Sequence, residues 1–150
     1  TVAQLKELDS VEDIIMIGYP NALWDEVNNI PLVRKGITAT PAWIDFNGKK
    51  EFVIDAACFP GSSGSPVLLC NIGNVKNKFG GIQFGINRIY LLGLLYGGPQ
   101  QTIEGEICVK TVPDATRTPY ALSSIPNNLG YVIKSERILE LSEYILTKIK

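Results

Sequence analysis

Residues 55–69 read Asp-Ala-Ala-Cys-Phe-Pro-Gly-Ser-Ser-Gly-Ser-Pro-Val-Leu-Leu. Apolar runs at residues 52–54 and 67–69 flank the polar centre, Gly-Ser-Ser-Gly-Ser-Pro at 61–66. We therefore expect two buried strands joined by a tight turn, because glycine permits backbone angles that residues with a Cβ resist. Such a turn can aim successive N–H groups at one point beside a serine hydroxyl, which is the arrangement of a nucleophile next to an oxyanion hole.

A glycine-serine turn between two strands can also be purely structural, because such turns are common and most carry no chemistry. The stretch also differs from the nucleophile turn of the α/β-hydrolases, which reads Gly-x-Ser-x-Gly and leads into a helix. Here Ser65 stands at the second glycine position, and a short apolar run follows it. The residues alone therefore leave a catalytic and a structural turn open.

The rest of the chain consists mainly of short apolar runs, which is typical of an all-β protein. Asn47-Gly48 between two of these runs is a strong hairpin signal. Residues 71–81 are expected to form a polar loop, and residues 100–128 an irregular segment with one strand at 106–112. The other strands are expected at residues 14–19, 32–40, 43–46, 51–55, 67–70, 89–96 and 130–133.

One amphipathic helix is expected to close the chain, over residues 135–149. Ile138, Leu141, Ile145 and Ile149 recur on one face of such a helix. Ser135 stands at the position of an N-cap, with acidic residues following it and lysines at the far end, as the helix dipole favours. We expect the apolar face to pack against the strands.

Composition and charge exclude several classes of function. Hydrophobic residues make up 45% of the 150 residues and charged residues 19%, as in one globular domain with its own core. The 14 basic and 15 acidic residues leave a net charge of −1. We therefore expect no nucleic-acid partner and no membrane partner. No apolar run approaches the length of about 20 residues that spans a bilayer.

The chain contains no histidine and three scattered cysteines, Cys58, Cys70 and Cys108. An odd number of cysteines without a Cys-x-x-Cys pair is typical neither of a disulfide framework nor of a zinc site. We therefore expect free thiols, no metal and no cofactor. The cysteines, and the lack of a secretory signal at the first residues, favour the cytoplasm.

The order of the motifs resembles that of the trypsin-like (chymotrypsin-fold) serine peptidases, in particular their bacterial HtrA-type branch. Residues 55–57, Asp-Ala-Ala, precede residues 61–66 at the distance that separates Asp-Ala-Ala from the family's Gly-Asp/Asn-Ser-Gly-Gly-Pro. Residues 15–20 are similar to the strand and Gly-x-Pro turn that open the family's second barrel, and residues 33–39 to its next strand. Residues 130–133 and the helix resemble its last strand and helix. The resemblance implies an all-β, antiparallel chymotrypsin-like half-barrel with a C-terminal helix over residues 1–150.

By this resemblance Ser63 is the nucleophile, and the backbone N–H groups of Gly61 and Ser63 form the oxyanion hole. Ser62 stands where trypsin itself has an acid. An activation mechanism that pairs a new N-terminus with that acid therefore has no partner here. Ser65 replaces the family's second glycine, a small change for such a turn.

The resemblance also implies a substrate-binding surface. Phe59 and Pro60 would line the first pocket, and the lack of charge in this segment disfavours a preference for arginine or lysine. Tyr96, Gly97 and Gly98 would pair with the backbone of the substrate peptide, a form of strand addition. The alternative is an ordinary barrel strand that ends in a glycine turn.

A Ser-His-Asp triad cannot be assembled from this chain, because it has no histidine. In the resembled family, the histidine and the aspartate come from the first barrel. We expect the chain to be the second barrel of a serine endopeptidase that is inactive alone. Its expected partners are a peptide or protein substrate and the missing N-terminal barrel of the same protein. Two alternatives are a catalytically inactive barrel that binds peptides or proteins and a self-contained β-domain with a structural turn.

Overall fold

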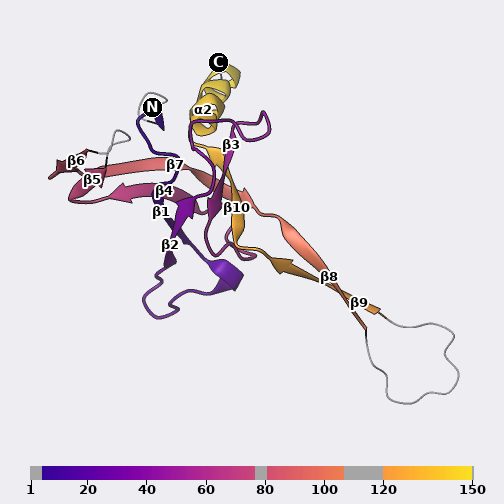
Figure 1. Cartoon of the computed structure of the whole chain (residues 1–150). Helices are drawn as coiled ribbons and strands as arrows, with labels where there is room; N and C mark the ends of the chain where they lie inside the picture. The colour runs from indigo at the N-terminus through magenta and orange to yellow at the C-terminus, as the bar shows by residue number, and fades with distance from the viewer. Residues whose placement is uncertain (1–4, 77–80, 107–119, 150) are drawn as a thin grey trace, which may run out of the picture.

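The computed structural model describes residues 5–76, 81–106 and 120–149, and its centre is a closed antiparallel barrel (Figure 1). The six barrel strands are β1 (Asp13–Gly18), β2 (Leu32–Thr38), β3 (Glu51–Asp55), β4 (Pro66–Asn71), β7 (Arg88–Gly97) and β10 (Leu129–Lys134). They follow one another in the order β1-β2-β3-β10-β7-β4, and β4 closes the barrel against β1. The neighbouring strands β4, β1, β2 and β3 therefore have the order of a Greek key. The expected antiparallel barrel with one C-terminal helix is confirmed.

Apolar side chains from all the barrel strands except β2 fill the interior. β1 alternates, so that Ile14 and Met16 are fully buried between more exposed neighbours. In β3, Val53 is buried as well as Phe52 and Ile54, and both of its backbone groups bond to Thr40. Burial of each side chain of this size contributes about 1.5–3 kcal/mol to the stability of the fold. The sequence must therefore keep apolar residues in each barrel strand, and this apolar pattern predicts the ends of each barrel strand to within two residues. The other strands add Val67, Leu69, Leu92, Leu95 and Val132.

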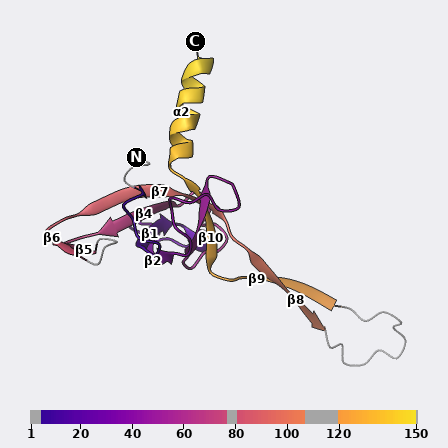
Figure 2. The same cartoon turned by 45° about the horizontal axis from the view of Figure 1, so that its top comes forward.

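Two hairpins extend from the barrel where the sequence predicts loops. β5 (Asn74–Lys76) pairs with β6 (Ile82–Phe84), and β8 (Gln100–Glu106) pairs with β9 (Tyr120–Pro126). The β8–β9 hairpin leads away from the barrel in both views (Figures 1 and 2). Of the strand expected at 106–112, Glu106 is the last residue of β8, and the rest lies outside the described residues. Residues 107–119 separate β8 from β9 in the sequence, and they contain no Asn-Gly or Asp-Gly pair of the kind that marks a hairpin.

The Asn47-Gly48 turn is confirmed, but the strand expected before it is not. Asn47 and Gly48 have φ of 52° and 73°, and Phe46 bridges to Lys49. Residues 43–46 form turns instead, because the N–H of Ile44 bonds back to the carbonyl oxygen of Pro41 at 3.1 Å. Residues 41–46 therefore do not lengthen the sheet, and Ala42 among them is buried in the core.

The closing helix, α2 (Glu136–Lys148), has the expected bounds but not the expected packing. None of its residues is buried, and it extends away from the barrel (Figure 2). Ser135 alone joins β10 to α2, so no loop is present that could turn the helix back onto the strands. The side chain of Ser135 makes no cap bond; instead its backbone N–H donates to the carbonyl oxygen of Leu92 at 2.8 Å.

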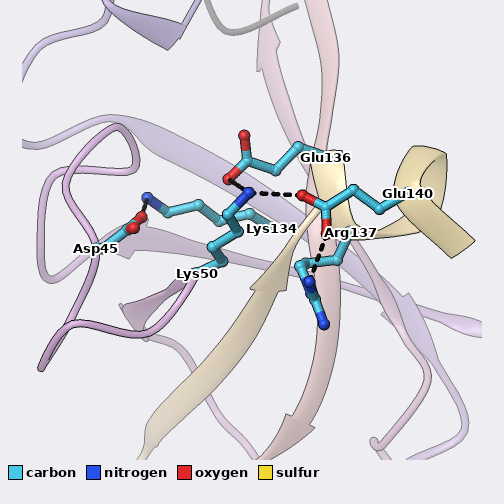
Figure 3. Close-up of polar contacts among 6 residues, drawn as sticks. All are labelled: Asp45, Lys50, Lys134, Glu136, Arg137 and Glu140. Carbon is cyan, nitrogen blue, oxygen red and sulfur yellow. Dashed lines mark hydrogen bonds and ion pairs between the residues drawn. The ribbon is translucent and has the colours of Figure 1, made fainter.

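Ion pairs hold the first turns of α2 beside the loop before β3 (Figure 3). Lys50 Nζ lies 2.5 Å from Glu140 Oε1 and 3.7 Å from Glu136 Oε1, and Arg137 also bonds to Glu140. Close by, Lys134 is buried and pairs with Asp45. Within the described ranges, no helix has the length and apolar character needed to cross a membrane.

Candidate active site

Two glycines shape the turn between β3 and β4. Gly61 and Gly64 have φ of 85° and 86°, in the left-handed region that favours glycine. A Cβ on Gly61 would lie only 2.8 Å from the carbonyl oxygen of Tyr19, so this position also lacks the space for a side chain. The N–H of Asn21 bonds to the carbonyl oxygen of Pro60 at 2.7 Å, which ties the turn to η1 (Pro20–Ala22).

The backbone N–H groups of the turn fall into two sets. Those of Ser62, Gly64 and Ser65 donate to carbonyl oxygens of Phe59, Leu95 and Ser62, at 3.0, 2.7 and 3.1 Å. Among the hydrogen bonds within the described part of the chain, none is donated by the N–H of Gly61 or of Ser63. Unpaired backbone donors on a turn can bind an oxyanion. They are the two donors that the resemblance to the peptidases implies.

The Ser63 side chain is exposed and lies beside the end of β7. Its Oγ donates a hydrogen bond to the carbonyl oxygen of Tyr96 at 3.1 Å. In the described residues no basic side chain bonds to Ser63 Oγ, so none of them acts as its general base in this arrangement.

A cavity of about 150 Å³ opens next to Ser63. One wall is the segment before the turn and the other is the segment that follows Tyr96, so four predicted substrate-binding residues meet in it. Among the residues that the structure describes, no charged side chain lines the cavity. Its lining residues are Cys58, Phe59, Pro60, Ser63, Leu95, Gly97, Gly98, Pro99, Gln100 and Leu129.

Tyr96 contributes its backbone to the site, while its side chain lies elsewhere. The hydroxyl of Tyr96 donates to Glu51 Oε2 at 2.9 Å, and its ring stacks on that of Tyr131 with centroids 6.0 Å apart. Burial and the hydrogen bond to Glu51 raise the pKa of Tyr96 to about 12. The stacked rings of Tyr96 and Tyr131 therefore form a surface on the outside of the barrel that is separate from the cavity beside Ser63.

The end of β7 is paired along one edge and is open past Leu95 on the other. β10 pairs with β7 as far as Gly97, whereas the pairing with β4 ends at Leu94. On this second edge the backbone groups of Leu95 still bond to Gly64 and Ser65 of the turn. A Cβ on Gly98 would lie 2.2 Å from the carbonyl oxygen of Leu129, while the space around Gly97 is open. An extended peptide could therefore be added along the open edge, beside Ser63.

Arg34 is part of this site, although the sequence interpretation did not identify it. It lies on β2, and its Nη2 donates to Ser62 Oγ at 2.6 Å while its Nη1 bonds to the carbonyl oxygen of Ala57. Burial lowers the pKa of Arg34. The signal was present in the alternation of β2, whose inward positions are Leu32, Arg34, Gly36 and Thr38. A charged residue at an inward position of a barrel strand needs a polar partner there.

Cys58 is buried, lines the cavity and lies near the charge of Arg34. Burial raises the pKa of its thiol, and the nearby Arg34 partly opposes this effect. Cys58 and Cys70 are free thiols, and Cys108 lies outside the described residues. Within the described ranges, no group of three or more potential ligands is placed to hold a metal ion. The polar chemistry of the site thus comes from Ser63, Arg34 and backbone groups.

Comparison with protein-family models, with curated proteins and with solved structures gives no match to this chain. The resemblance to trypsin-like peptidases therefore depends on the order of the motifs in the sequence. The roles of Ser63, Gly61 and the substrate-binding residues remain predictions.

Proposed function

We propose that this chain is the nucleophile-bearing barrel of a serine endopeptidase. The observation that carries the proposal is the exposed hydroxyl of Ser63 on a turn whose Gly61 and Ser63 N–H groups are unpaired in the described structure. An uncharged cavity and an open strand edge lie beside the same hydroxyl. A nucleophile, donors for an oxyanion and a place for an extended peptide are the elements that acyl transfer requires.

The proposed reaction passes through an acyl-enzyme. Ser63 Oγ attacks the carbonyl carbon of the scissile bond, and its proton passes to a base supplied from outside the chain. The N–H groups of Gly61 and Ser63 hold the oxyanion, and each donor is worth about 3–4 kcal/mol in a preorganised site. The base then returns the proton to the leaving amine, and water releases the acyl group as the acid. Without that base the serine hydroxyl is a poor nucleophile.

The cavity suggests a preference for a small uncharged side chain before the scissile bond. Its volume of about 150 Å³ lies below the range of roughly 300–1,000 Å³ that is usual for small-molecule sites. No carboxylate of the described residues lines it, so an arginine or lysine side chain would enter without a partner there and would lose its hydration.

The direct test is labelling of the full-length protein with a fluorophosphonate, followed by intact mass and peptide mapping. We expect one adduct on Ser63 and none on a Ser63→Ala variant. Absence of any adduct on the native protein would contradict a peptidase. The chain on its own is the control, because without an external base we expect its labelling to be very slow.

A second candidate is a catalytically inactive barrel that binds extended peptides. The observation in its favour is that Ser63 Oγ bonds to a backbone carbonyl oxygen rather than to a base. Peptide affinity in a protein that never forms an adduct at Ser63 would support this candidate. Peptide hydrolysis that is lost in Ser63→Ala would exclude it.

A further inference from the structure

Arg34 bonds at once to the segment before the nucleophile turn and to the turn itself. Its guanidinium reaches the carbonyl oxygen of Ala57, before the turn, and the hydroxyl of Ser62, within it. The planar guanidinium fork presents several donors in fixed directions, so one side chain can hold two acceptors at a set separation. Cys58, Phe59, Pro60 and Gly61 lie between these two anchors and are closed into a loop by them.

The anchored groups are adjacent to the donors of the proposed oxyanion hole. Ser62 is 1% exposed and stands between Gly61 and Ser63, whose N–H groups are unpaired in the described structure. The peptide group that follows Ser62 carries the Ser63 N–H, so a shift of the buried Ser62 side chain would rotate that donor. The Gly61 N–H belongs to the Pro60–Gly61 peptide, inside the loop that Arg34 closes between Ala57 and Ser62. The directions of the two donors therefore depend on both anchors together.

The guanidinium is costly to keep in this position. Within the described part of the chain it makes no ion pair, and its Nε is buried without a hydrogen-bond partner. A partly desolvated cation without a carboxylate is not an efficient means of stabilising a fold. Arg88 is a half-buried arginine of the same barrel whose Nε likewise has no hydrogen-bond partner, but it differs from Arg34 in pairing with a carboxylate, that of Glu12, at 3.3 Å.

We propose that Arg34 is a positioning residue that keeps the Gly61 and Ser63 N–H groups directed at the oxyanion. The proposal rests on the proposed peptidase function and deepens it, because it assigns the support of the turn to a side chain of strand β2. Arg34 does not contact the reacting atoms. Its effect passes through Ser62 Oγ and the carbonyl oxygen of Ala57.

The test measures inactivation of the full-length protein by an alkyl fluorophosphonate. In this reaction Ser63 Oγ bonds to phosphorus, fluoride leaves, the serine proton passes to the base, and the phosphoryl oxygen takes the place of the oxyanion. The maximal rate constant, kinact, reports the oxyanion site, and the half-saturation concentration, KI, reports binding. Arg34→Gln should lower kinact about a hundredfold, as loss of an oxyanion donor does, with little change in KI.

Three further variants separate positioning from stability. Arg88→Gln is the matched control, because it also removes a half-buried arginine; it should lower the melting temperature and leave kinact unchanged. Ser62→Ala removes one anchor and should lower kinact about tenfold, the effect of one hydrogen bond to a charged group. The double variant Arg34→Gln with Ser62→Ala should be no slower than Arg34→Gln alone, because the two residues act as one unit.

The outcomes distinguish this inference from the proposed function. If the native protein gains no adduct at Ser63, the proposed function fails and the inference falls with it. If the native protein reacts and folded Arg34→Gln reacts at the same rate, only the role of Arg34 is overturned. If Arg34→Gln does not fold, Ser62→Ala and Arg34→Lys decide, and unchanged kinact in both would overturn it. Arg34→Lys should lie between the native protein and Arg34→Gln, because an ammonium cannot bridge both acceptors as a guanidinium does.

Discussion

The hydroxyl of Ser63 donates to the carbonyl oxygen of Tyr96, at the open edge of β7. The same carbonyl oxygen is the acceptor that a peptide added along this edge would use for its own N–H. Ser63 and a bound peptide therefore compete for one acceptor. The hydroxyl must leave this bond before it can transfer its proton to a base.

This competition predicts how Ser63→Ala affects binding. Removing the hydroxyl frees the Tyr96 carbonyl oxygen, so an extended peptide should bind the variant no more weakly and up to about tenfold more tightly, the value of one hydrogen bond. Fluorescence anisotropy with a labelled, uncleaved peptide would measure the affinity. A tenfold loss of affinity would show that the peptide does not pair with this edge.

Gly61→Ala should damage the turn more than a glycine replacement elsewhere. A left-handed alanine costs roughly 1–2 kcal/mol, and the new Cβ would also press on the Tyr19 carbonyl oxygen, 2.8 Å away. Gly48→Ala is the control, since Gly48 has φ of 73° with open space around it. Urea unfolding should show the larger loss for Gly61→Ala, and only this variant should slow labelling of Ser63. Equal losses in both variants would argue against the contact with Tyr19.

Tyr96 should titrate about two pH units above an ordinary tyrosine. Its pKa is raised from 10.0 to about 12, so the neutral phenol is favoured in the folded state. This contribution to stability is complete below about pH 10 and is lost as the pH rises toward 12. The difference in tyrosinate absorbance between native protein and Tyr96→Phe would give the midpoint. Glu51→Gln should bring the midpoint closer to 10, because it removes the negative partner of the phenol; an unchanged midpoint would exclude this cause.

The two ion-pair groups of Figure 3 should differ in their effect on stability. Lys134 is 3% exposed, so Asp45→Asn leaves a buried ammonium with a weaker partner and should cost about 2 kcal/mol. Glu140 is an exposed partner of Lys50, so Glu140→Gln should have little effect, as is usual for surface pairs. Thermal unfolding at low and high salt would compare them. A larger loss for Glu140→Gln would contradict the difference in burial.

The sequence predicts those parts of the structure that depend on local pattern. The strand around Phe52, the Asn47-Gly48 turn and the bounds of α2 follow from apolar periodicity and turn residues. The β8–β9 hairpin is not predicted in this way, because residues 107–119 separate its two strands in the sequence and contain no Asn-Gly or Asp-Gly pair. The direction of α2 was missed for a related reason, since an apolar stripe indicates a contact face without giving its partner.

The same distinction applies to the candidate site. The segment around Ser63 stands out in the sequence because glycines and serines interrupt two apolar runs. Arg34 is distant from it in the sequence and reaches it only when the barrel closes, since β2 and the turn are brought together by strand pairing. The contact between Arg34 and the turn produces no local sequence pattern. Its one sign in the sequence is a charged residue at an inward position of β2.

The position of the β8–β9 hairpin has an evolutionary consequence. Gln100 begins β8 immediately after the cavity wall formed by Gly97, Gly98 and Pro99, while the barrel register is fixed by strands on either side of this insertion. Because the closure of a longer loop costs little additional entropy, the hairpin can lengthen, shorten or be exchanged while the barrel stays folded. Natural variation in this one segment could therefore change which ligands the barrel accepts without redesigning the turn that carries Ser63.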